Sequence, residues 1–130
     1  MEREDRIFEN IIKILFETQV SAHYYHLNTR SYAIHNALGK YYDGITEEID
    51  NFAELYMGMC TDYERIHAPE SISLSYNLHD SELYSYFDEV ANKLEEKYLK
   101  YGFESEILRD RLTQIIQFIR KTVYLLNRLQ

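Results

Sequence analysis

Apolar side chains recur at every third or fourth position along four long stretches of this chain, which is the period of an amphipathic α-helix. One proline and four glycines in 130 residues leave these stretches largely free of helix-breaking residues. The pattern predicts helices over about residues 3–27, 32–60, 81–101 and 106–129. The chain is therefore predicted to be an all-α protein.

Residues that start or end helices stand at the borders of these stretches. Ser31 and Ser105 each precede a periodic segment and are predicted to cap it through the hydroxyl group. Asp80 or Ser81 is predicted to cap the third helix, and Gly102 is predicted to end it as a C-terminal glycine.

Residues 61–79 interrupt the helical period and are predicted to form a connection. Pro69 and the alternation of serine with Ile72, Leu74 and Tyr76 argue against a long helix there. A connection of this length can cross a bundle, so we predict a ferritin-like four-helix bundle with a long connection between helices 2 and 3. Plain up-down-up-down order is the alternative, and residues 1–130 are predicted to be a single domain.

The composition argues against several classes of protein. The formal net charge is −8, whereas affinity for nucleic-acid phosphates comes from clustered Lys and Arg, so DNA binding is not expected. Cys60 is the only cysteine, which excludes an intrachain disulfide and suits a reducing compartment such as the cytoplasm. The charged N-terminus is unlike a signal peptide, and no apolar run is long enough to span a membrane.

Five side chains are candidate metal ligands. His23 and His26 lie in the first predicted helix, and His35, Asp50 and Glu54 lie in the second. Imidazole nitrogens combined with carboxylate oxygens suit a transition metal such as iron better than Mg²⁺ or Ca²⁺. Either His23 or His26 can supply the first-helix ligand, and the pattern leaves this choice open.

The spacing along the second helix excludes a complete site within one chain. Asp50 and Glu54 are four residues apart and share a helical face, whereas His35 precedes Asp50 by fifteen residues. At about 1.5 Å of rise per residue, His35 and Asp50 are roughly 22 Å apart. An antiparallel two-fold pairing centred near Tyr42 would bring His35 of one copy to Asp50 of the other. We therefore predict a homo-oligomer with a two-fold interface, either a dimer or a larger shell.

The ligand pattern resembles that of the Dps family, the miniature ferritins. His23, His35, Asp50 and Glu54 reproduce the family's separations of twelve, fifteen and four residues. Residues 26–31 resemble the family's His-Trp-Asn-x-x-Gly segment, and on that alignment His26 is the first ligand. Residues 26–58 look closer still to small uncharacterised Dps-like proteins of tailed phages, which would place the protein in the host cytoplasm.

This resemblance implies an iron site between two-fold-related subunits, at which Fe(II) is oxidised by oxygen or peroxide. The chain departs from the family at Gly39, where Dps proteins carry an acidic ligand, and it lacks a Lys-rich tail. Gly39 and Gly44 lie near the midpoint between His35 and Asp50. A helix-interior glycine costs about 1 kcal/mol relative to alanine, which a close approach of two helices would explain.

Two classes of function follow from these observations. The leading expectation is a Dps-like iron-binding protein, for which ferroxidase-type activity is left open. The alternative is a non-enzymatic, phage-encoded oligomeric binding or structural protein with a vestigial metal site, which the absence of an acid at Gly39 favours.

Overall fold

The computed structural model describes residues 2–129, and within them the chain is helical and has no strand, which confirms the all-α prediction. The long helices are α1 (Arg3–Asn28), α2 (Tyr32–Met59), α3 (Leu83–Lys93) and α4 (Glu106–Arg128). A 3₁₀ turn, η1 (Asp80–Glu82), leads into α3, and a π-helical turn, η2 (Leu94–Leu99), extends it.

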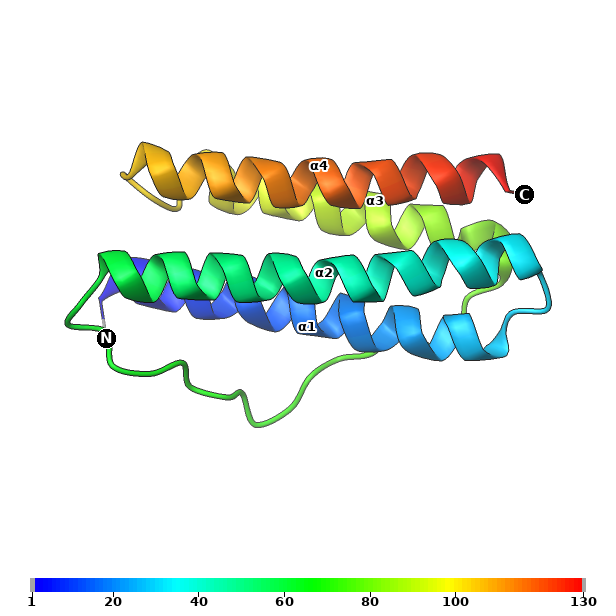
Figure 1. Cartoon of the computed structure of the whole chain (residues 1–130), viewed down its shortest axis with the longest axis horizontal. Helices are drawn as coiled ribbons and strands as arrows, with labels where there is room; N and C mark the ends of the chain where they lie inside the picture. The colour runs from blue at the N-terminus through cyan, green and yellow to red at the C-terminus, as the bar shows by residue number, and fades with distance from the viewer. Residues whose placement is uncertain (1, 130) are drawn as a thin grey trace.

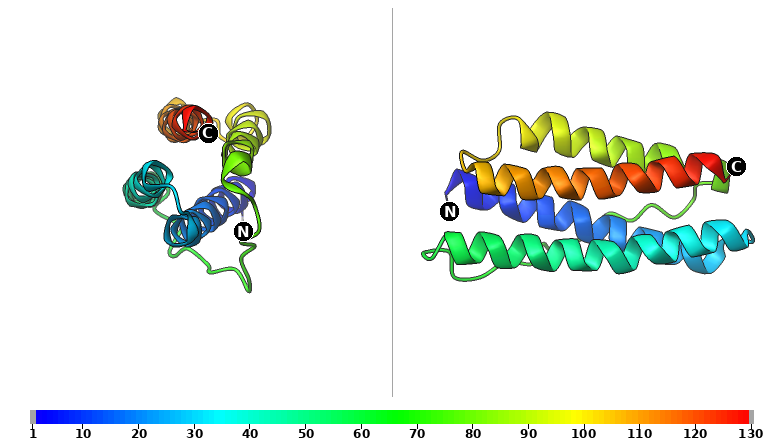
Figure 2. Two further views of the ribbon diagram at one scale, coloured as in Figure 1. Left: turned by 90° about the vertical axis from the view of Figure 1, so that its right-hand side faces the viewer. Right: turned by 45° about the horizontal axis from the view of Figure 1, so that its top comes forward.

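The four helices pack side by side as a bundle. Helices α1 and α2 form an antiparallel hairpin, and residues 60–79 then run back along the bundle, so that α3 points in the same direction as α2 (Figure 1). Helix α4 returns antiparallel to α3. Viewed end-on, the helices occupy four corners and the connection passes outside α1 (Figure 2). None of the helices in the described part of the chain is long and apolar enough to cross a membrane.

A continuous apolar core runs along the bundle axis and joins all four helices. Its most deeply buried members include Phe8, Leu15, Leu38, Ile45, Phe52, Phe87, Leu94, Leu112 and Ile119. The end that contains the N-terminus is rich in aromatic rings, and there the Phe8 ring stacks on Tyr56 with 4.1 Å between ring centroids. Aromatic contacts of this kind stabilise a core beyond the area that they bury.

The serine caps form as predicted, whereas the borders of the third helix differ. The Ser31 hydroxyl accepts a hydrogen bond from the Ile34 N–H, and the Ser105 hydroxyl accepts one from Leu108. His79, rather than Asp80 or Ser81, caps the first turn of the third helix, in a capping box with Glu82. The Asp80 carboxylate instead accepts a hydrogen bond of 2.8 Å from Thr29 at the end of α1.

Contacts within the chain explain Gly44 and Gly102, whereas a Cβ at Gly58 would meet no neighbour within 4 Å. Gly102 lies just beyond the end of the third helical segment, as predicted, but among the described residues no glycine has the positive φ that is common at helix ends. A Cβ at Gly102 would lie 2.3 Å from the Tyr98 carbonyl oxygen, and a Cβ at Gly44 would lie 2.4 Å from the Phe118 ring. The Phe118 ring of α4 therefore packs directly over Gly44 in α2.

The buried face of α2 includes Ile34 and Tyr41, whereas the neighbouring His35 and Tyr42 lie beside it. Tyr41 is buried and points into the core, whereas Tyr42 is only partly buried. His35 is likewise half-buried. His35 and Tyr42 therefore lie at the edge of α2 that faces the end of α1, where their rings stack on His26 and His23.

Candidate metal centre

His26 and His35 join the end of α1 to the start of α2, beside the turn of the α1–α2 hairpin. Nδ1 of His26 lies 2.7 Å from the backbone oxygen of His35, and Nδ1 of His35 lies 2.7 Å from the backbone oxygen of His26. The two rings stack, with 3.7 Å between centroids and 19° between planes. This His26–His35 clasp satisfies the His26 carbonyl, which lies in the last turn of α1 and is therefore without the usual intrahelical partner.

The clasp fixes which ring nitrogens remain open. A carbonyl oxygen only accepts hydrogen bonds, so Nδ1 of each ring carries the proton and donates. In the neutral rings, Nε2 then holds the lone pair, which is the arrangement usual for a metal-ligating histidine. The lone pair lies in the plane of its ring, and two nearly parallel stacked rings cannot both direct it at one ion. One of the two rings must turn before His26 and His35 can share a metal.

Gly39 makes room for the clasp. A Cβ at this position would lie 3.1 Å from Cε1 and 3.3 Å from Nδ1 of the His26 ring. An acidic side chain at position 39 would therefore compete with His26 for the same space. This competition explains why position 39 is a glycine, whereas the sequence resemblance predicts an acidic residue there.

His23 is the open imidazole of the three. Its side chain is exposed, and its ring stacks on Tyr42 with 4.2 Å between centroids and 19° between planes. The His23 and His26 rings are 6.0 Å apart and inclined at 66°. Neither ring nitrogen of His23 has a hydrogen-bond partner among residues 2–129.

Asp50 and Glu54 lie on the far half of α2, away from the imidazoles. Both side chains are exposed, and neither forms an ion pair or a hydrogen bond with another described residue. No group of three or more His, Cys, Asp or Glu residues within the described range could hold a metal ion. A single chain thus brings His23, His26 and His35 together and leaves the two carboxylates apart from them.

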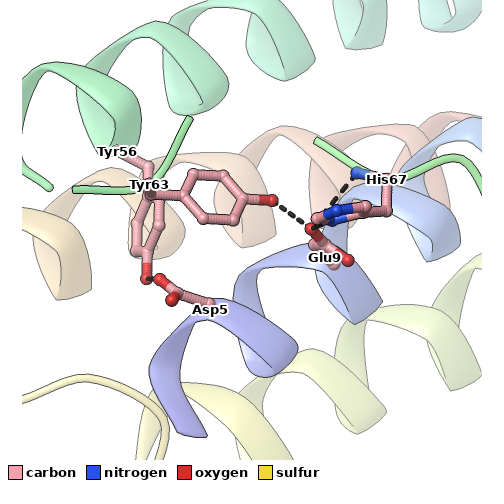
Figure 3. A network of polar contacts seen from close by, with 5 residues as sticks. All are labelled: Asp5, Glu9, Tyr56, Tyr63 and His67. Atoms are coloured by element: carbon pink, nitrogen blue, oxygen red, sulfur yellow. Dashed lines mark hydrogen bonds and ion pairs between the residues drawn. The ribbon is translucent and has the colours of Figure 1, made fainter. Parts of the chain in front are cut away.

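A second polar cluster, at the opposite end of α1, was not anticipated. Tyr56 donates a hydrogen bond to Asp5, and Glu9 accepts from the Tyr63 hydroxyl and from the ring and backbone nitrogens of His67 (Figure 3). Nδ1 of His67 lies 2.8 Å from Glu9. The cluster ties the start of the connection to α1.

Burial and hydrogen bonding shift the pKa of the Glu9 carboxyl in opposite directions, but they shift the pKa values of the Tyr63 and Tyr56 hydroxyls in the same direction. Burial by itself raises the pKa of the Glu9 carboxyl, but the hydrogen bonds from Tyr63 and His67 outweigh it and hold that pKa below its usual value. Burial raises the pKa of the Tyr63 hydroxyl, and its bond to Glu9 raises it further. Burial and then the bond to Asp5 raise the pKa of Tyr56 in the same way.

Side chains of α1 hold the connection along much of its length. Four backbone N–H groups of the connection donate to α1: His67 to Glu9 at 3.2 Å, Ser73 to Glu17 at 2.6 Å, Ser75 to Ser21 at 2.9 Å, and Leu78 to the Tyr25 hydroxyl at 3.1 Å. These acceptors are spaced by multiples of four residues and so form one stripe on the helix. That polar stripe is the sequence signal by which the path of the connection could have been found.

Comparison with known proteins yields one match. A family model described as a family of unknown function, DUF5856, matches residues 26–126, a range that includes His26, His35, Asp50 and Glu54 but not His23. No curated protein and no solved structure matches the chain.

Proposed function

The chain belongs to this family of unknown function, and we propose that it is a ferritin-like, Dps-like subunit that binds iron at a site shared between two-fold-related copies. The order of the helices supports the ferritin-like assignment, because α2 and α3 run in parallel and a connection along the bundle joins them. Such a site would support oxidation of bound Fe(II) to Fe(III), with oxygen or peroxide as the electron acceptor.

One observation carries the proposal: unpartnered imidazole and carboxylate groups lie at opposite ends of one hairpin. His23 is exposed near the end of α1, while Asp50 and Glu54 are exposed near the end of α2. Because α1 and α2 are antiparallel, the end of α1 and the end of α2 lie at opposite ends of the hairpin. A two-fold axis through the middle of the hairpin, perpendicular to the helices, would bring one end of the first copy to the other end of the second. The imidazoles of one copy would then face the carboxylates of the other.

The side chains that have no partner within one chain can be assigned roles as metal ligands. His23 is free to bind, whereas His26 is held in the clasp, so His23 is our preferred ligand from α1, with His35 joining it once its ring turns. Asp50 and Glu54 would come from the partner. Imidazole selects against Mg²⁺ and Ca²⁺, and two carboxylates offset the charge of the ion and favour its oxidised form.

Surface composition near His23 supports association of two copies. Tyr24, Leu27 and Tyr32 are large apolar side chains with 52%, 65% and 77% of their surface exposed. Exposed large apolar side chains such as these are a feature of surfaces that bind another protein chain. The proposed assembly is a homo-oligomer, and the contact described here can build a dimer or a larger shell.

Anaerobic Fe(II) titration followed by iron analysis tests the site. We expect Asp50→Asn to lose most of the bound iron, because a neutral amide neither offsets the charge nor binds as strongly as a carboxylate. Asp110→Asn is the matched control, since Asp110 is an exposed aspartate of α4 that has no ligand role in the proposal. Comparing His23→Ala with His26→Ala identifies the imidazole that α1 supplies. Equal iron content in the Asp50 and Asp110 variants would reject the site.

A second candidate function is a non-enzymatic oligomer with a vestigial metal site. The stacked His26–His35 clasp favours it, because the rings fill the space above Gly39 and bond to backbone carbonyls instead of facing an open cavity. If this function is correct, elemental analysis of the purified protein will find no iron, zinc or manganese. The wild-type chain will then bind no more Fe(II) than the Asp50→Asn variant does.

A further inference from the structure

The connection leaves a hollow against α1 between two of its attachment points. It is bound to the helix at Glu9 through His67 and again at Glu17 through Ser73. Between these points residues 68–72 form no hydrogen bond with the described part of α1, and Figure 1 shows the connection bowing outward along this side of the bundle. The space beneath is a groove of about 420 Å³, which we call the α1 groove.

The α1 groove is mainly apolar. Its floor and roof include Ile12, Phe16, Val20, Ile66, Ala68, Pro69 and Ile72. Phe16 and Ile72, which both line the groove, have 41% and 40% of their surface exposed. A concave apolar site of this volume lies within the range found for small-molecule binding sites.

One cation that lines this groove forms no ion pair with a described residue. Lys13 lines it and lies four residues from both Glu9 and Glu17, the spacing at which ion pairs form on a helix. Both carboxylates bind the connection instead, Glu9 through Tyr63 and His67 and Glu17 through Ser73. Lys13 itself forms no ion pair with any residue in the range 2–129.

We propose that the α1 groove binds an amphiphilic anion, a medium-chain alkyl carboxylate, with its head at Lys13 and its chain among Phe16, Pro69 and Ile72. The remaining charged groups at the groove are Glu9, His67 and Glu70. The Glu9 carboxylate accepts hydrogen bonds from Tyr63 and His67, and Glu70 is exposed at the rim. The site shares none of the proposed metal ligands, so iron binding and carboxylate binding can succeed or fail separately.

Calorimetric titration with octanoate and with its neutral analogue 1-octanol tests this site. Lys13→Met keeps the apolar stem and removes the charge, so we expect octanoate affinity to fall about fivefold and octanol affinity to stay within about twofold. Glu70→Gln should strengthen octanoate binding, because it removes the one repelling rim charge. Ile72→Asn should weaken both probes, and Lys121→Met, on an exposed part of α4, should change neither.

Three outcomes would overturn the proposal, each with circular dichroism showing folded variants. The first is an absence of saturable octanoate binding to the wild-type chain. The second is an equal loss of octanoate and octanol affinity in Lys13→Met, which would show that the charge has no part in binding. The third is an assembly that Ile72→Asn converts to single chains, which would show by light scattering that a second copy covers the groove.

Discussion

At the scale of single residues, the two neighbouring histidines of α1 have different tasks, although the sequence presents them as equivalent candidates. His26 donates to the His35 carbonyl and stacks on its ring, whereas His23 is exposed and contacts only other rings. We therefore expect His26→Ala to lower the free energy of unfolding by about 1–3 kcal/mol, since it removes both the hydrogen bond to the His35 carbonyl and the stacked ring contact. His23→Ala should stay within about 0.5 kcal/mol of the wild-type chain. Urea denaturation of the metal-free protein measures both, and equal losses would contradict the clasp.

At the scale of elements, the connection is fastened to α1 by a carboxylate whose protonation state controls the contact. The pKa of Glu9 is lower in the folded chain than its ordinary value of 4.5. Its contribution to stability is therefore complete above about pH 4.5 and is lost as the pH falls through the folded value. Glu9→Gln should lower stability near neutral pH by about 1–3 kcal/mol and flatten its decline between about pH 5 and 3. Urea denaturation across this range tests it, with the exposed Glu47→Gln as control; parallel curves for the Glu9 variant and wild type would contradict the assignment.

At the scale of the whole molecule, what could be predicted from the sequence followed from local rules. Helix periods and serine caps depend on nearby residues, so the four helices and the caps at Ser31 and Ser105 could be predicted. The Phe118 ring over Gly44 and the bonds from Glu9 to the connection join residues distant in the sequence, and the His26–His35 clasp joins two different helices. Their partners depend on how α1, α2, α4 and the connection are placed in space, which periodicity does not specify.

The metal proposal also belongs to this largest scale, because its ligands meet only if two chains associate. The chain places its imidazoles and its two free carboxylates at different ends of α2, and the described residues hold no complete metal site. The two-fold pairing remains a prediction, and the exposed Tyr24, Leu27 and Tyr32 mark the surface where it should form.

The most direct measurement of this shared site is iron binding by a mixture of two defective variants. His35→Ala lacks an imidazole and Asp50→Asn lacks a carboxylate, so neither should bind iron when its copies pair with themselves. After unfolding and joint refolding, each mixed pair would hold one intact site, and random pairing predicts about one quarter of the wild-type iron content. Iron content that stays at the level of the separate variants, in a mixture shown to contain mixed pairs, would contradict a site built from two chains.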